Sequence, residues 1–138
     1  MSFREQSAWV MALLMIATGL YYGWSVAAAS RAIGATAPAI VVIGYVFWVV
    51  VGSIVIQVAL ALSSPKEATA PADERERSVE QRAGNWSGFV LAAGAVLALG
   101  HFLVSGDGNM LFHLVMASLI VSQIADYSLQ ILLLRRSL

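Results

Sequence analysis

Four long apolar segments constrain this chain more than any other feature of its sequence. They cover residues 8–29, 38–62, 86–105 and 110–134. Each is close to the roughly 20 residues that an α-helix needs to cross the hydrocarbon core of a bilayer. Polarity within them does not alternate every second residue, as the strands of a membrane β-barrel would require. We therefore predict an all-α integral membrane protein, a four-helix bundle that forms a single domain.

The composition agrees with lipid as the main solvent and partner of the chain. Of the 138 residues, 59% are hydrophobic and 12% are charged, whereas a soluble domain has roughly 45–50% apolar and about 25% charged residues. The formal net charge is zero, which gives no case for nucleic-acid binding. The chain has no cysteine, so disulfides, thiolate metal sites and cysteine nucleophiles are excluded.

The first apolar segment could in principle be a signal peptide. It follows Arg4 and ends in Ala27-Ala28-Ala29, small residues of the kind found at cleavage sites. However, residues 8–29 are too long for a typical signal core and have the length of a span. We expect this segment to be retained, which leaves an even number of membrane crossings.

Basic residues are distributed unevenly between the loops. Arg31 lies between the first and second segments, and none lies between the third and fourth. The other seven lie before the first segment, in the loop of residues 63–85, or after the fourth segment. The positive-inside rule then predicts that both termini and the long loop are cytoplasmic.

The loop of residues 63–85 is the longest polar stretch of the chain. Pro65 cannot continue the preceding helix, and acids in the first turn after residue 73 favour a new helix over about 73–84. The ordinary interpretation is a solvated juxtamembrane helix. The alternative is a docking surface for a cytoplasmic protein partner, formed by Asp73, Glu74, Arg75, Glu76 and Arg77.

Residues 73–136 resemble a group of small bacterial predicted membrane proteins of unknown function. The shared features are an acidic and basic run that leads into a span, and a last span with an acid, a glutamine and paired arginines. Here these are Asp73-Glu74-Arg75-Glu76-Arg77, then Asp126, Gln130 and Arg135-Arg136. The resemblance implies a multi-pass protein of the bacterial inner (plasma) membrane, and it carries over no activity.

Ionisable side chains inside a span are costly to insert and often mark functional sites. Asp126 is one, and Gln123 and Gln130 lie at helical spacing from it, so the three form a polar stripe. Gln57 in the second segment lies at a similar depth and could complete the set. We interpret the stripe as a structural clamp. The alternative is a small oligomeric transporter or channel subunit that uses Asp126 as a proton or ion relay.

The turn between the last two segments is centred near Asp107, so residues equally far from it on either side lie level. Asp126 is then level with Gly88, and His101 is level with His113. Two imidazoles at one depth on adjacent helices could bind haem or a metal and make the chain a membrane electron carrier. The ordinary interpretation is two unrelated histidines near the outer interface and no cofactor.

Small residues share one face of the third segment and the residues just before it: Gly84, Gly88, Ala92 and Gly100. Such a face allows close helix approach, either inside the bundle or between two copies in a homodimer. The chain has no glycine-rich phosphate loop, Ser/His/Asp set or metalloprotease motif. We therefore predict a small non-enzymatic membrane protein that acts through helix packing or through a partner of its cytoplasmic loop.

Overall fold

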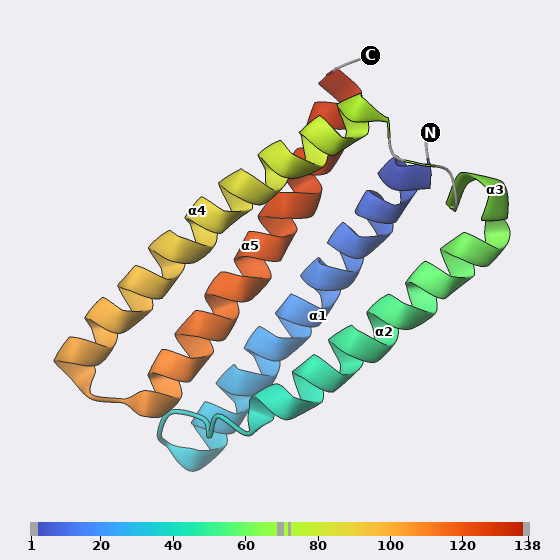
Figure 1. Cartoon of the computed structure of the whole chain (residues 1–138). Coiled ribbons are helices and arrows are strands. Elements are labelled where there is room, and N and C mark those ends of the chain that lie inside the picture. Colours follow the sequence, from blue (N-terminus) through green and yellow to red (C-terminus); the bar gives the residue numbers. More distant parts are fainter. Residues whose placement is uncertain (1–2, 69–70, 72, 137–138) are drawn as a thin grey trace.

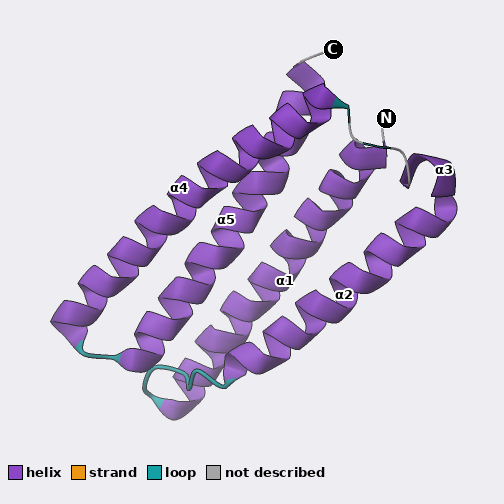
Figure 2. Ribbon diagram, in the orientation of Figure 1, coloured by secondary structure: helices purple, strands orange, loops and turns teal. Residues whose placement is uncertain are grey.

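The computed structural model describes residues 3–68, 71 and 73–136, and in this part of the chain all regular structure is helical (Figure 2). A short helix α3 (Pro65–Ala68) accompanies four long ones, α1 (Phe3–Ile33), α2 (Val41–Ser63), α4 (Glu74–Ser105) and α5 (Gly108–Arg136). Each long helix is long and apolar enough to cross a membrane. The all-α class and the four span-length helices predicted from the sequence are confirmed.

The long helices lie side by side in the order α4, α5, α1, α2 (Figure 1). Helices α1 and α5 form the inner pair, and α1 begins at the end of the bundle where α5 ends (Figure 1). The outer helices α2 and α4 each pack chiefly against one neighbour. Much of their apolar surface therefore faces outward, which suits lipid as the surrounding medium.

Helix α4 runs without interruption from the polar loop residues into the third apolar segment. It begins with a capping box, in which the Asp73 carboxylate accepts from the Glu76 N–H and the Glu76 carboxylate accepts from the Asp73 N–H at 3.4 Å. The Asp73 carboxylate also accepts a hydrogen bond from the Glu74 N–H at 2.8 Å. Such a box satisfies N–H groups that have no partner inside the helix. The juxtamembrane residues and the span are thus a single rigid element.

The turn between α4 and α5 is built by its own residues. Gly106 takes a left-handed conformation with φ of 67° and ends α4, as glycine commonly does because it has no Cβ. Asp107 then caps α5, since its Oδ1 accepts a hydrogen bond from the Met110 N–H at 3.1 Å. The turn stays short, and α4 and α5 become antiparallel neighbours.

Small residues bring the inner helices close to their neighbours. A Cβ on Gly94 would lie 2.6 Å from the Ser118 Cβ across the α4–α5 contact. A Cβ on Gly19 would lie 2.7 Å from Ile120 Cγ2 across the α1–α5 contact. Both distances are shorter than carbon–carbon contact, so glycine permits the close backbone approach that membrane helices use to gain dispersion energy.

The predicted small-residue face of α4 does not take part in this packing. A Cβ added to Gly84, Gly88 or Gly100 would meet nothing within 4 Å. The interpretation that these glycines pack inside the bundle is therefore wrong. Gly94, which lies on another side of α4, makes the close contact with α5 instead, and the face that includes Gly84 and Gly88 points away from the rest of the chain.

Candidate functional site

Asp126 lies on α5 at its contact with α4. The Ser122 hydroxyl, one turn before Asp126, donates a hydrogen bond to the Ser87 carbonyl of α4 at 2.9 Å. Gln130 of the same helix and Glu80 of α4 are both near enough to interact electrostatically with the Asp126 carboxyl group. Oδ1 of Asp126 is nevertheless buried without a hydrogen-bond partner among the described residues. A buried acceptor of this kind is expensive to leave unpaired.

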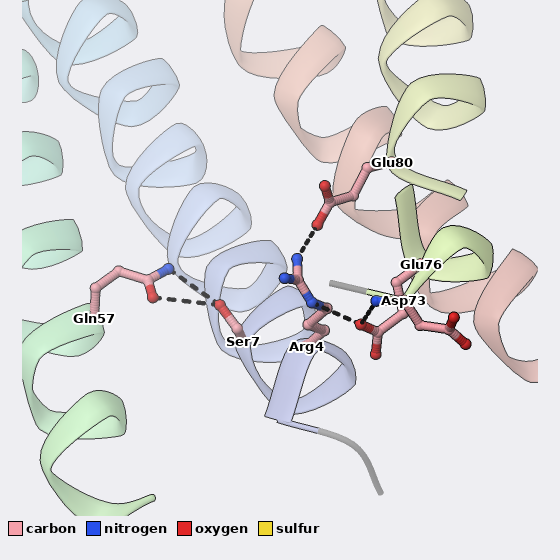
Figure 3. Close-up of polar contacts among 6 residues, drawn as sticks. All are labelled: Arg4, Ser7, Gln57, Asp73, Glu76 and Glu80. Atoms are coloured by element: carbon pink, nitrogen blue, oxygen red, sulfur yellow. Dashed lines mark hydrogen bonds and ion pairs between the residues drawn. The ribbon is translucent and has the colours of Figure 1, made fainter. Parts of the chain in front are cut away.

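The structure does not bring the whole predicted stripe together. Gln123 is exposed, whereas Asp126 and Gln130 are partly buried. Gln57 does not complete the set, because it lies on the α1 side of α2 and its Nε2 donates to the Ser7 hydroxyl at 3.1 Å (Figure 3). Helix α1 lies between α2 and α5, so Gln57 and Asp126 belong to different helix contacts.

The charged end of the bundle is held by ion pairs that cross between helices. The Arg4 guanidinium of α1 lies between two carboxylates of α4, with Nε 2.8 Å from Glu76 Oε2 and Nη1 2.5 Å from Glu80 Oε1 (Figure 3). The side chains are between 24% and 47% exposed. Each such pair contributes at most about 1 kcal/mol. Their main effect is to fix the start of α1 against the start of α4.

These contacts use part of the predicted docking segment within the chain itself. Asp73 caps α4, and Glu76 both completes the capping box and binds Arg4. Arg75 Nη2 donates to the Leu134 carbonyl near the end of α5 at 3.4 Å. Glu74 and Arg77 are exposed. The segment therefore joins α1, α4 and α5 at this end. Asp73 and Arg75 are exposed as well, so Glu76 is the one residue of the five that is partly buried.

A second contact joins α1 and α5 at the same end. Arg135 Nε lies 3.1 Å from Glu5 Oε1, and the Arg135 guanidinium carbon lies 5.3 Å from the centroid of the Trp9 ring. A guanidinium at this distance from an indole makes a favourable cation–π contact. Trp9 Nε1, however, is buried and has no hydrogen-bond partner in the described part of the chain.

His113 is buried at the opposite end of the bundle, and both its ring nitrogens are hydrogen-bonded. Nε2 lies 2.8 Å from the Ala37 carbonyl oxygen, which can only accept, so Nε2 carries the proton. Nδ1 then accepts from the Tyr22 hydroxyl at 2.6 Å. The Tyr22 ring packs in turn on Tyr45 of α2, with 4.9 Å between ring centroids. His113 thereby connects α1, α5 and the loop before α2.

The structure does not bring His101 and His113 together. His101 is exposed, and its Nδ1 pairs with the Ser105 hydroxyl of the same helix at 3.2 Å. The two histidines line separate grooves, one between α4 and α5 and the other between α1 and α5. Within the described ranges, no three His, Cys, Asp or Glu residues are grouped so that they could hold a metal ion.

Further hydrogen bonds join the loop between α1 and α2 to the start of α5. The Thr36 hydroxyl donates to Asp107 Oδ2, and the Ala39 N–H donates to Asn109 Oδ1 at 3.2 Å. The hydrogen bond from Thr36, together with that from the Met110 N–H, lowers the pKa of Asp107, because both stabilise its charged form. The two helical hairpins are thus fastened to each other at this end.

Sequence reasoning missed Tyr22 and Arg4, which make two of the most specific contacts. Tyr22 lies near the end of the first segment and His113 near the start of the fourth, so antiparallel helices place them at similar depth. Arg4 similarly precedes the first segment and lies at the same end as Glu76 and Glu80. Matching depths between the first segment and the fourth could have found Tyr22, and matching the first segment with the residues before the third could have found Arg4.

Comparisons with family models, with curated proteins and with solved structures give no match. Most of the polar side chains described above bind one another across helices and hold those helices in register. Two buried side-chain atoms of the described residues are exceptions, Asp126 Oδ1 and Trp9 Nε1.

Proposed function

We propose that this chain is a non-enzymatic, multi-pass protein of the bacterial inner membrane. We propose that it acts by packing against other helices in the membrane plane, and that two copies form a homodimer. The observation that carries the proposal is the outward face of α4. A Cβ at Gly84, Gly88 or Gly100 would meet open space, and α4 packs chiefly against α5 alone.

Glycines on an outward helix face need a physical reason. Each costs about 1 kcal/mol of helix propensity relative to alanine. Neither Gly84 nor Gly88 makes a close helix contact within the bundle that would offset this cost. A second helix packed on this face would approach closely and gain dispersion contacts. Leu99, which is 54% exposed and lies eleven residues, or about three turns, after Gly88 on the same face of α4, would add apolar area to this contact.

Substitution of the α4 glycines tests the assembly. We expect wild-type protein in mild detergent to have a native mass of two chains, and Gly88→Leu to shift it to one chain. Gly44→Leu is the matched control, because Gly44 lies on the outer helix α2 and also has open space at its Cβ. A monomeric wild type, or a dimer equally tolerant of Gly88→Leu and Gly44→Leu, would refute assembly through α4.

The proposed orientation has both termini in the cytoplasm. Support comes from the positive-inside rule and from the position of α1's first and α5's last residues at one end of the bundle (Figure 1). Since the chain has no cysteine, single introduced cysteines report the side directly. In intact cells we expect an impermeant thiol reagent to label Ala35→Cys and not Ser78→Cys, and the reverse result would invert the topology.

Asp126 supports a second candidate, a transporter or channel subunit. Its Oδ1 is buried without a partner in the described residues. Glu80 of α4 lies near Asp126 and also binds Arg4 at the charged end of the bundle. A relay would bind a proton or cation at that oxygen. The test is flux in proteoliposomes: this candidate predicts that Asp126→Asn abolishes flux and that Gln123→Leu, at an exposed position on the same helix, retains it. Equal flux in Asp126→Asn and wild type would exclude the relay.

A further inference from the structure

An apolar groove runs along one face of the bundle between α1 and α5. The part nearest the charged end has a volume of about 440 Å³ and is lined by α1 side chains from Trp9 to Ile16 and by α5 side chains from Ser128 to Arg135. A second part of about 460 Å³ shares Ile16 and continues toward Ala27. The groove therefore follows α1 through most of its length.

The length of the groove matches a lipid tail. Trp9 and Gly19 both lie on its α1 wall, and ten residues of α-helix extend about 15 Å. That is half of a hydrocarbon core of about 30 Å, the depth of one leaflet. A single acyl chain that entered at Trp9 would thus reach Gly19 with apolar side chains on both sides.

The mouth of the groove differs from its walls because it carries hydrogen-bond donors. The side chain of Arg135 is 58% exposed, and its bond to Glu5 uses Nε, one of the five N–H donors of a guanidinium. Trp9 Nε1 is a second donor, buried beside Arg135 and without an acceptor among the described residues. A phosphate group offers the negative charge and the oxygen acceptors that these two donors require.

We propose that this groove binds an anionic phospholipid, with its phosphate at Arg135 and Trp9 and one acyl chain between α1 and α5. Basic pockets between membrane helices on the cytoplasmic side recognise anionic headgroups in this way. Glu5, which is 12% exposed, offsets part of the Arg135 charge. The preference over a zwitterionic lipid is therefore moderate, about fivefold, as expected for one arginine at a membrane surface. The site does not depend on assembly through α4.

Native mass spectrometry of the full chain in mild detergent, titrated separately with phosphatidylglycerol and phosphatidylcholine, tests the headgroup site. We expect phosphatidylglycerol to bind about fivefold more tightly, and Arg135→Gln to remove that preference. Arg31→Gln is the matched control, an exposed arginine in the last turn of α1 at the other end of the bundle. Trp9→Phe keeps the ring but loses the donor, and should weaken phosphatidylglycerol binding about threefold.

The tail site is tested separately. Ser128 is exposed on the groove wall, so Ser128→Phe should fill the groove and weaken both lipids, whereas Ser53→Phe on α2 should weaken neither. Arg135→Lys keeps the charge and should restore most of the preference lost in Arg135→Gln. A restored preference would also show that the fold survives replacement of Arg135. Equal binding of the two lipids by wild type, or an equal loss in Arg31→Gln and Arg135→Gln, would overturn the proposal.

Discussion

The close approach of α4 and α5 at Gly94 gives the sharpest test of this structure. In Gly94→Ala the new Cβ would lie 2.6 Å from the Ser118 Cβ and 3.4 Å from its Cα. Ordinary carbon contacts lie at about 3.5–4.0 Å, so the two helices must separate by roughly 1 Å. A rotamer change of Ser118 cannot relieve the clash, because Cα and Cβ do not move with χ1. Overpacking of this kind costs about 1–3 kcal/mol.

Alanine also raises helix propensity by about 1 kcal/mol relative to glycine, so a matched substitution is needed to isolate the clash. Gly44→Ala serves, because Gly44 lies within helix α2, outside the proposed α4 interface, and has open space at its Cβ. We expect the free energy of unfolding, measured by SDS titration in mixed micelles with far-ultraviolet circular dichroism, to be about 1–3 kcal/mol lower for Gly94→Ala than for Gly44→Ala.

The double variant Gly94→Ala/Ser118→Gly removes the atoms that clash and should recover much of this loss. A double-mutant cycle would then give a coupling energy of about 1 kcal/mol or more, as residues in direct contact do. If Gly94→Ala and Gly44→Ala unfold with the same free energy, α4 and α5 do not approach closely at Gly94.

Three further predictions concern the two ends of the bundle, each read from the same unfolding titration. Tyr22→Phe leaves Nδ1 of the buried His113 without its donor and should lower the free energy of unfolding by about 1–3 kcal/mol; no loss would mean that Tyr22 does not bind His113. Because its folded pKa is lowered, Asp107 stabilises the protein above pH of about 4, and that contribution is lost as pH falls through the folded pKa; Thr36→Val should flatten this acid dependence, and an unchanged slope would contradict it. Arg4→Gln removes two partly exposed ion pairs and should cost less than about 2 kcal/mol, and less still in high salt; a larger or salt-independent loss would point to a different role.

The two ends of the bundle are held together by different kinds of interaction. At the charged end, partly exposed ion pairs hold α1 to α4 and α5. At the other end, hydrogen bonds from buried or partly buried groups join α5 to the loop between α1 and α2. Buried bonds depend on geometry and ion pairs depend on the surrounding salt, so the two ends should respond to different perturbations.

The sequence predicted some of the side-chain groupings in the candidate sites and not others. Asp126 and Gln130 do lie together, because helical spacing along one segment is a local property. Gln57 was expected to join them and instead binds Ser7. His101 and His113 lie level along adjacent helices, but only His113 is buried, and its partners are Tyr22 and Ala37. The depth of a residue in the bundle can be counted along its helix, whereas the neighbouring helix that its side chain faces cannot.

The sequence by itself determined that the long elements are helices, how many there are, and how α4 is joined to α5. Apolarity over a span-length segment leaves the backbone no alternative to helix in lipid. The turn at Gly106 and Asp107 depends on residues adjacent in the chain. Only the tertiary structure decided the lateral order α4, α5, α1, α2 and the rotation of each helix about its axis. Spans that are apolar on every side carry little periodic signal of which side packs, so contacts far apart in the sequence make that choice.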